Sequence, residues 1–279
     1  MRLVFLFLLA SACSEKTEVD TDTQSTLDTE SDTDTDTDTD TGVEETPWDC
    51  SAMYTDSQLL TVNSGRTYSI DLQTAHVEEV ADYSSASVRP SDPNSVAFAP
   101  KAKAWVSDSG DDRLMLLDVC EAEFVSIGPT GFGHLCGISY GADGALYGID
   151  SHTDSLVQLD MNTGAGTTVG SLGRDVGNCG LSLDCLTGTL YGVDGVQGAL
   201  FEIDIATGSA STTVNFALSN MASVGLEFDP ADSTLLMSNG PTLFRMDPST
   251  GALTNIGDFD LGSGFNDLAF HIGPLPCAR

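Results

Sequence analysis

The sequence predicts an all-β domain folded as a β-propeller, with five four-stranded blades as its simplest arrangement and six blades as the alternative. The segment LYGID at Leu146–Asp150 gives the first indication, because it returns 44 residues later as LYGVD at Leu190–Asp194. Short apolar runs separated by Gly, Asp, Asn and Thr give the second, since they read as strands and turns. No sustained helical period interrupts these runs.

The repeat is clearest at the polar residue that ends each LYGID-like run. These residues follow one another at spacings of 45, 42, 44 and 45 positions: Asn63, Asp108, Asp150, Asp194 and Asn239. Around Asp150 the unit contains four β-like runs in the order GISY, LYGID, LVQLD and GTTVG. Four short strands in each unit of this length are typical of propeller blades, and cover by two neighbouring blades explains why the strands are apolar on both faces.

The residues of the predicted turns suit the turn conformation. The third run of each unit ends in an aspartate, at positions 71, 118, 160, 204 and 247, and three of the five continue into Thr-Gly. We expect each aspartate to accept hydrogen bonds from its own turn and each of these glycines to adopt positive φ.

The two ends of the domain predict how the ring closes. FNDLAFHI, from Phe265, matches the opening-strand pattern and is followed by nothing that could pair with it, while the first unit lacks an opening strand. We therefore expect it to be the innermost strand of the first blade. DCSAMY, around Cys50, aligns loosely with LCGISY around Cys136 and is the alternative opening strand.

The chain begins MRLVFLFLLASAC, a short apolar segment after one cation, which predicts a signal peptide over residues 1–12. It is too short to span a membrane, which needs about 20 apolar residues. Small residues followed by Cys13 resemble the lipobox of bacterial lipoproteins, although Leu9 stands one position early. The resemblance implies that Cys13 is lipidated and that the protein is anchored in the cell envelope, with the outer membrane as the expected site. Ordinary cleavage and secretion is the alternative.

Residues 13–47 form the predicted tether between anchor and propeller. This Asp/Thr-rich segment contains SDTDTDTDTDTG and 13 acidic residues, with scarcely any apolar side chain. It cannot bury enough surface to offset the entropy of ordering, so we expect a disordered, extended spacer.

The predicted propeller domain, residues 48–279, is strongly acidic, with 29 Asp and Glu against 8 Lys and Arg. A formal charge of −21 repels phosphate backbones, so nucleic acid is not an expected partner. Six cysteines in an exported domain favour disulfides. We expect Cys136 to pair with Cys179 at equivalent places in adjacent blades, and Cys50 with Cys277 at the joined chain ends, which leaves Cys120 and Cys185 over.

Two segments resemble known repeat families. AWVSDSGDDRLMLLDV, from Ala104, looks like the NHL repeat, and LYGID with LVQLDMNTG looks like the YVTN and quinoprotein-type repeats of bacterial surface proteins. The resemblance implies a propeller and says little about activity, because such propellers host binding and several chemistries.

The candidate ligand residues lie where blades present polar groups to the top of the ring. Asn63, Asp150, Asp194 and Asn239 end second strands, but Asp and Asn at such places are also ordinary turn formers. The densest acidic cluster, Asp108, Asp111 and Asp112, is the weak candidate for a metal, and Ca²⁺ is the cation that it would take. Nearer the axis we expect a second group of candidates: Asn94, His134, Asn266 and Asp267.

Two functions follow from these residues. The first is a non-catalytic, surface-tethered propeller that binds a protein, glycan or other ligand through its top-face loops. The second is a metal-dependent hydrolase or lyase that uses the axial funnel, as a resemblance to gluconolactonase-type propellers, which hold a catalytic cation on the axis, would imply. His134 and Asp267 are the candidate acid/base pair. The only glutamate near the axis is Glu227, inside GLEF and away from the matching position, which favours the first.

Overall fold

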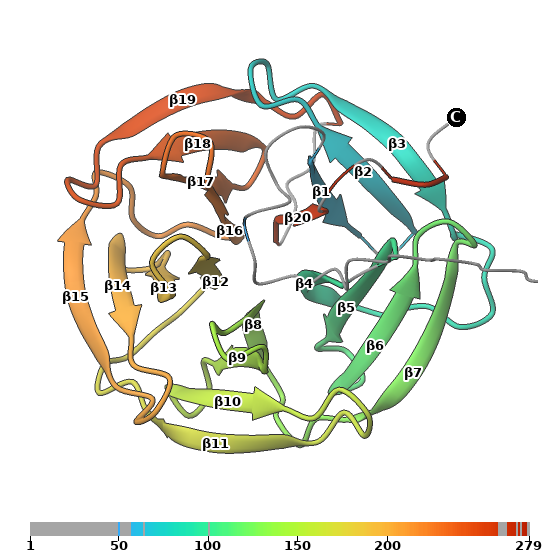
Figure 1. The fold of residues 1–279 in the computed structure, drawn as a ribbon, viewed down its shortest axis with the longest axis horizontal. Helices are drawn as coiled ribbons and strands as arrows, with labels where there is room; N and C mark the ends of the chain where they lie inside the picture. The colour runs from blue at the N-terminus through green and yellow to red at the C-terminus, as the bar shows by residue number, and fades with distance from the viewer. Residues whose placement is uncertain are drawn as a thin grey trace, which may run out of the picture. The chain divides into compact units, whose positions relative to one another are not determined.

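The structure, a computed structural model, describes residues 50, 57–63, 65–99, 101–261, 267–271, 273 and 275–277. The described residues form five four-stranded antiparallel sheets arranged around a central axis, as a five-bladed β-propeller (Figure 1). The predicted signal peptide, Cys13 and nearly all of the tether belong to a separate unit, Met1–Thr41, and lie outside the described residues with the rest of the tether. The described part of the chain contains no helix that is long and apolar enough to cross a membrane.

Each blade runs from an innermost strand at the axis to an outermost strand at the rim. Blade 1 contains β20 (Ala269–His271), β1 (Gln58–Val62), β2 (Arg66–Ile70) and β3 (Val77–Asp82). Blade 2 contains β4 (Pro93–Ala99), β5 (Lys103–Asp108), β6 (Arg113–Asp118) and β7 (Glu123–Pro129). Blade 3 contains β8 (Leu135–Tyr140), β9 (Leu146–Asp150), β10 (Ser155–Leu159) and β11 (Gly166–Ser171). Blade 4 contains β12 (Cys179–Asp184), β13 (Thr189–Asp194), β14 (Ala199–Ile203) and β15 (Ala210–Asn215). Blade 5 contains β16 (Val224–Asp229), β17 (Thr234–Asn239), β18 (Thr242–Met246) and β19 (Leu253–Asp258).

The last strand of the chain closes the ring, as the sequence predicts. β20 pairs antiparallel with β1, with Leu59 opposite Phe270 and Leu60 opposite Ala269. The alternative opening strand DCSAMY is described only at Cys50, which lies in a 3-10 turn, and residues 51–56 are outside the described residues. The five-blade prediction is therefore confirmed.

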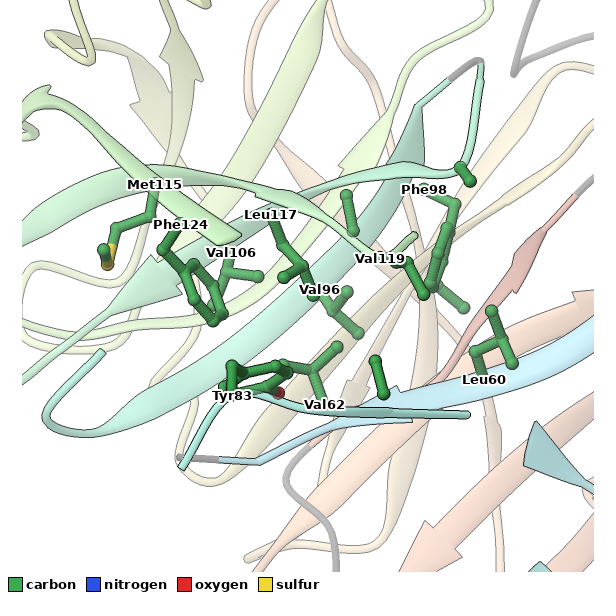
Figure 2. Packing of buried hydrophobic residues seen from close by; sticks show 14 of the residues in the cluster. Leu60, Val62, Tyr83, Val96, Phe98, Val106, Met115, Leu117, Val119 and Phe124 are labelled. Atoms are coloured by element: carbon green, nitrogen blue, oxygen red, sulfur yellow. The ribbon is translucent and has the colours of Figure 1, made fainter. Parts of the chain in front are cut away.

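The core lies between blades, because each sheet presents apolar side chains to both neighbours. Figure 2 shows the cluster between blades 1 and 2, where Leu60 and Val62 of β1 meet Val96 and Val106 of the next blade. The rings of Tyr83 and Phe124 pack edge to face there, with centroids 4.8 Å apart. Burial of such side chains contributes about 1.5–3 kcal/mol each, so the blades depend on one another for stability.

The turns between third and fourth strands have the predicted chemistry. Asp160 Oδ1 accepts hydrogen bonds from the backbone N–H groups of Asn162 at 2.8 Å and Thr163 at 3.1 Å, and these bonds lower its pKa. Gly164 then adopts a φ of 80°. The aspartates at 71, 118, 204 and 247 likewise accept bonds within their own turns, so these residues serve the fold.

Candidate functional site at the top face and the axis

The two faces of the ring are defined by strand direction. We name the face on which innermost strands begin the top face, and the opposite face the bottom face. Second strands run antiparallel to innermost strands, so they end at the top face. Third strands end at the bottom face for the same reason.

The polar residues that end the second strands are bonded within their own turns. Asn63 Oδ1 accepts from the N–H groups of Gly65 at 2.9 Å and Arg66 at 2.7 Å. Asp150 accepts from Thr153, and Asp194 accepts from the N–H of Val196 at 2.9 Å. Asn239 ends β17 in the same place. Asn63, Asp150 and Asp194 therefore each shape their own top-face loop.

Arg113 occupies the centre of the predicted metal cluster. Asp108 is buried, and its Oδ2 accepts from Arg113 Nε at 3.0 Å, while Asp111 pairs with Arg113 Nη2 at 3.0 Å. Burial opposes ionisation of Asp108, but hydrogen bonds from Asp92, Ser91 and Arg113 outweigh it and lower its pKa. Asp112 is exposed beside them. Within the described residues, no group of three or more His, Cys, Asp or Glu side chains could hold a metal ion.

His134 and Asp267, the predicted acid/base pair, each have other partners in the structure. His134 Nδ1 lies 2.9 Å from Ser151 Oγ, and its ring lies 5.4 Å from that of His152. Asp267 is 3 % exposed and has other partners at the axis. Asn94 donates a hydrogen bond to the backbone oxygen of Leu135 at 3.0 Å, which joins blades 2 and 3. Asn266 lies outside the described residues.

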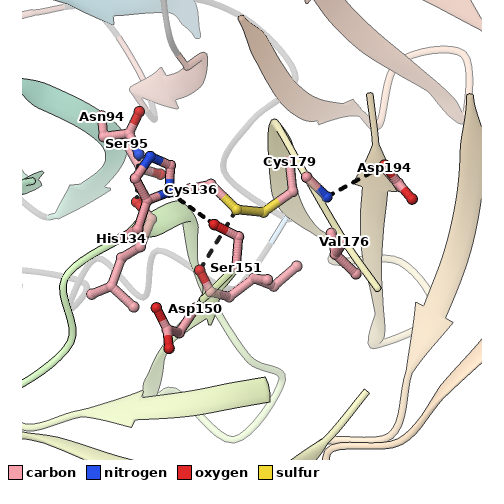
Figure 3. Close-up of a disulfide and its surroundings, with 12 residues drawn as sticks. Asn94, Ser95, His134, Cys136, Asp150, Ser151, Val176, Cys179 and Asp194 are labelled. Atoms are coloured by element: carbon pink, nitrogen blue, oxygen red, sulfur yellow. Dashed lines mark hydrogen bonds between the residues drawn. A yellow bond between two sulfur atoms is a disulfide. The ribbon is translucent and has the colours of Figure 1, made fainter. Parts of the chain in front are cut away.

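The disulfides match the sequence prediction in one pair of three. Cys136 and Cys179 are bridged at the top face, where they begin adjacent innermost strands (Figure 3). The predicted bridge between Cys50 and Cys277 is wrong, because Cys50 pairs with Cys185 and Cys277 with Cys120. No cysteine from Cys50 onward is left over. The chain ends are fastened to blades 4 and 2 instead of to each other.

Three glycines allow the innermost strands to approach closely at the top of the axis. A Cβ added to Gly137 would lie 2.6 Å from Leu181 N, and one added to Gly225 would lie 2.7 Å from the Cα of Asp267. A Cβ added to Gly180 would lie 2.9 Å from Leu226 N. The equivalent residues in the other two blades are Ser95 and Asp267.

Asp267 joins three blades at the axis. Its Oδ2 accepts from Ser95 Oγ and from Val96 N at 3.0 Å, and its Oδ1 accepts from Leu226 N at 3.3 Å. An innermost strand is a sheet edge, and its axis-facing N–H groups have no strand partner. A buried N–H without a partner is costly, so Asp267 is a structural hub.

Glu227, in β16 of blade 5, also joins blades at the axis, because it accepts hydrogen bonds from residues of blades 1 and 4. Its Oε1 accepts from Phe270 N at 3.0 Å, and its Oε2 accepts from Ser182 Oγ at 3.1 Å. Burial raises the pKa of both Glu227 and Asp267 to about 8, against the hydrogen bonds that favour their ionised forms. The sequence held a signal for this role, because each of these acids stands where the other four units of the repeat have glycine, serine or alanine.

One cavity that the described residues leave on the axis is small. The cavity beside Glu227 measures about 40 Å³ and is also lined by Ser139, Tyr140, Phe228 and Cys185. A single water needs roughly 10–15 Å³ by this kind of measure. The cavity therefore accepts small solvent molecules and not a sugar-sized substrate.

Comparison with known proteins gives the fold alone. No family model and no curated protein sequence matches the chain. A chain of the nidogen/laminin complex is 15% identical with a TM-score of 0.54, over 78% of this chain and 99% of that chain. A structural-genomics protein of unknown function from Bacteroides thetaiotaomicron is 14% identical with a TM-score of 0.54, over 78% of this chain and 65% of that chain. The chain thus spans about two thirds of the length of the second.

Proposed function

We propose that the protein is a lipid-anchored protein of the bacterial cell envelope whose propeller is a non-catalytic binding module, with a protein or glycan ligand held by the top-face loops. The membrane is a partner through the lipid on Cys13, and the tether of residues 13–47 holds the propeller away from it. Three disulfides support a location outside the cytoplasm.

The observation that carries the proposal is the position of the chain ends. Cys185 follows β12 directly and Cys120 lies two residues after β6, so both of these cysteines belong to the bottom face. Their partners are Cys50, the first described residue after the tether, and Cys277, near the C-terminus. Both bridges to the chain ends therefore lie at the bottom face, and the top-face loops carry no bridge to a chain end, so we assign the binding surface to the top face.

The fold supports a binding role more than an enzymatic one. The axial cavity of about 40 Å³ has no room for a substrate, and Asp267 and Glu227 are engaged by backbone and serine donors. The similar nidogen/laminin chain comes from a complex between proteins. Loops carried on a rigid scaffold are the usual place for recognition.

Site-specific photocrosslinking in intact cells tests the proposal. Val196 lies in a top-face loop of blade 4 and is 42% exposed, and Leu186 lies in a bottom-face loop of the same blade and is 47% exposed. A photoreactive residue at position 196 should capture a cell-surface protein or glycan. The same residue at position 186 is the matched control and should capture far less. Equal capture at both positions, or capture at 186 alone, would show that the top face is not the binding face.

A further inference from the structure

Two histidines meet at the top face between blades 2 and 3. The chain contains four histidines: His76, His134, His152 and His271. His271 is buried in β20, and His76 pairs with Asp260. The rings of His134 and His152 instead lie beside each other, with centroids 5.4 Å apart and planes tilted by 33°. His134 stands directly before β8, and His152 lies in the β9–β10 loop.

A hydrogen-bonding partner orients the ring of His134. Ser151 Oγ lies 2.9 Å from His134 Nδ1, and Ser151 N donates to the backbone oxygen of His134 at 3.1 Å (Figure 3). A metal-binding histidine usually has its other ring nitrogen bonded in this way, which fixes the tautomer and the orientation of the ring. When Nδ1 donates its hydrogen to Ser151 Oγ, the lone pair of Nε2 is available to a metal ion.

The distance between the two rings suits a shared metal ion. Imidazoles bind Zn²⁺ at about 2.0–2.1 Å, which puts the centroids of two rings on one tetrahedral ion roughly 5 Å apart. His152 is exposed, so its ring can turn toward the ion without disturbing the core. The described residues supply no third side chain that could complete a closed site. Water would therefore fill the remaining positions, as it does in open zinc sites.

A carboxylate lies next to the histidine pair. From the point that a Cβ added to Gly133 would occupy, His152 Nδ1 is 3.5 Å away and Asp112 Oδ1 is 3.6 Å away. The negative charge of Asp112 favours a cation in this space. A carboxylate near a metal ion can also accept a hydrogen bond from a metal-bound water. Blade 2 thus contributes charge, and the two histidine loops contribute nitrogen ligands.

We propose that His134 and His152 form an open site for a divalent transition metal of the zinc class. Ser151 is the positioning residue of His134, and Asp112 is the acceptor for a metal-bound water. Imidazole nitrogen suits Zn²⁺, whereas Ca²⁺ prefers oxygen ligands. The inference does not depend on the proposed function, because the histidine pair can bind an ion whether or not the top-face loops hold a protein or glycan.

Zinc titration of the full chain carrying Cys13→Ala tests the site. This substitution removes the one cysteine outside the three disulfides, so no free thiol competes for the metal. Imidazole ¹⁵N NMR should show shifts for His134 and His152 as Zn²⁺ is added. The resonances of His76 and His271 are the internal reference and should stay in place.

Calorimetry on variants of the same chain assigns the ligands. His152→Ala should weaken zinc binding by at least about tenfold, and Ser151→Ala should also weaken it. Ser151→Thr keeps the hydroxyl and should restore the affinity. His76→Ala is the matched control, because it removes an exposed histidine outside the site, and it should leave the affinity unchanged.

Calcium separates imidazole binding from binding by the many carboxylates of the chain. Its affinity should be the same in the parent chain and in His152→Ala, because Ca²⁺ prefers oxygen ligands. Equal zinc shifts at all four histidines would overturn the proposal. So would a zinc affinity that His152→Ala leaves unchanged, or one that His76→Ala lowers as much as His152→Ala does.

Discussion

At the scale of single residues, the turn between third and fourth strands needs one residue in the left-handed region. Glycine supplies it in blades 3, 4 and 5, whereas Ala75 and Ala122 adopt φ values of 61° and 54° at the same place in blades 1 and 2. The turn also packs against the outermost strand of the preceding blade. Position 208 is thus constrained by conformation and by space together.

Gly208→Ala should therefore cost more stability than a left-handed alanine alone. Gly208 has a φ of 75°, and its added Cβ would lie 2.7 Å from the backbone N and O of Gly170. We expect a loss of about 2–4 kcal/mol in the free energy of unfolding, measured by urea denaturation. Gly131→Ala is the control, because φ there is 79° with nothing within 4 Å of the added atom, and it should cost about 1 kcal/mol. Equal losses would contradict the tight contact between turn and strand.

The axial carboxyls predict a stability that falls on the alkaline side. The pKa of Glu227 is about 8 in the folded protein, against about 4.3 for an unfolded glutamate. The folded state favours the protonated form, so this contribution is complete below about pH 4 and is lost as pH rises through about 8. The turn aspartates, whose pKa values are lowered, lose their contribution only on the acid side.

Glu227→Gln imitates the protonated acid and should flatten the loss of stability between pH 5 and pH 9 by on the order of a few kcal/mol. Urea unfolding across this range measures the effect. Glu78→Gln changes an exposed glutamate and is the control, which should keep the wild-type slope. A Glu227→Gln profile parallel to that of the wild type would show that this carboxyl does not carry the pH dependence.

At the scale of elements, ring closure rests on a short strand. β20 contains three residues and pairs with β1 at three positions. The bridge between Cys120 and Cys277 spans 157 residues and fastens the chain end to blade 2. Leu268, Ala269 and Phe270 at this end of the chain are buried. Pairing, burial and a covalent bond thus act together where the ring would otherwise open.

Deletion of residues 265–279 should make the protein unfold or aggregate. The change removes the pairing partner of β1 and side chains worth about 1.5–3 kcal/mol each, and it opens a sheet edge at the axis. Light scattering and thermal melting measure the outcome. Joint replacement of Cys120 and Cys277 by serine keeps the strand and should cost only roughly 2–5 kcal/mol. A truncated chain that stays monomeric with an unchanged melt would mean that β20 does not hold the ring closed.

At the scale of the whole molecule, the acidic charge of the chain and the proposed lipid on Cys13 bear on how far the propeller lies from the membrane. The chain carries a formal charge of −32, including the acidic tether. Like charges extend such a segment. We propose that the length of this tether sets the distance between the propeller and the membrane.

Cys13→Ala should move the protein from the membrane fraction to the soluble fraction and abolish fatty-acid labelling, because the lipid is the proposed anchor. Deletion of residues 14–46 should keep the label and leave the Tm unchanged within error, since the spacer that the sequence predicts here has too few apolar side chains to add packing to the fold. Wild-type protein without fatty-acid label, or with a different first residue, would show that the lipoprotein prediction is wrong.

The sequence alone determined the blades. The period of the repeat, its turn residues and its strands that are apolar on both faces predicted the fold, the strand order and ring closure by FNDLAFHI. All three features of the fold follow from local chemistry that is repeated along the chain. The bridge between Cys136 and Cys179 was predictable for the same reason, since the two cysteines hold equivalent positions in adjacent blades.

Only the tertiary structure decided what the unrepeated residues do. Cys50, Cys120, Cys185 and Cys277 could pair in several ways, and the choice depended on which loops the bottom face brings within reach of the chain ends. Asp267 became a hub because strands from blades 1, 2 and 5 direct N–H groups at one point. The contacts of Asp267 with blades 2 and 5 and the two disulfides join residues more than 40 positions apart, and no local pattern records the distance between them.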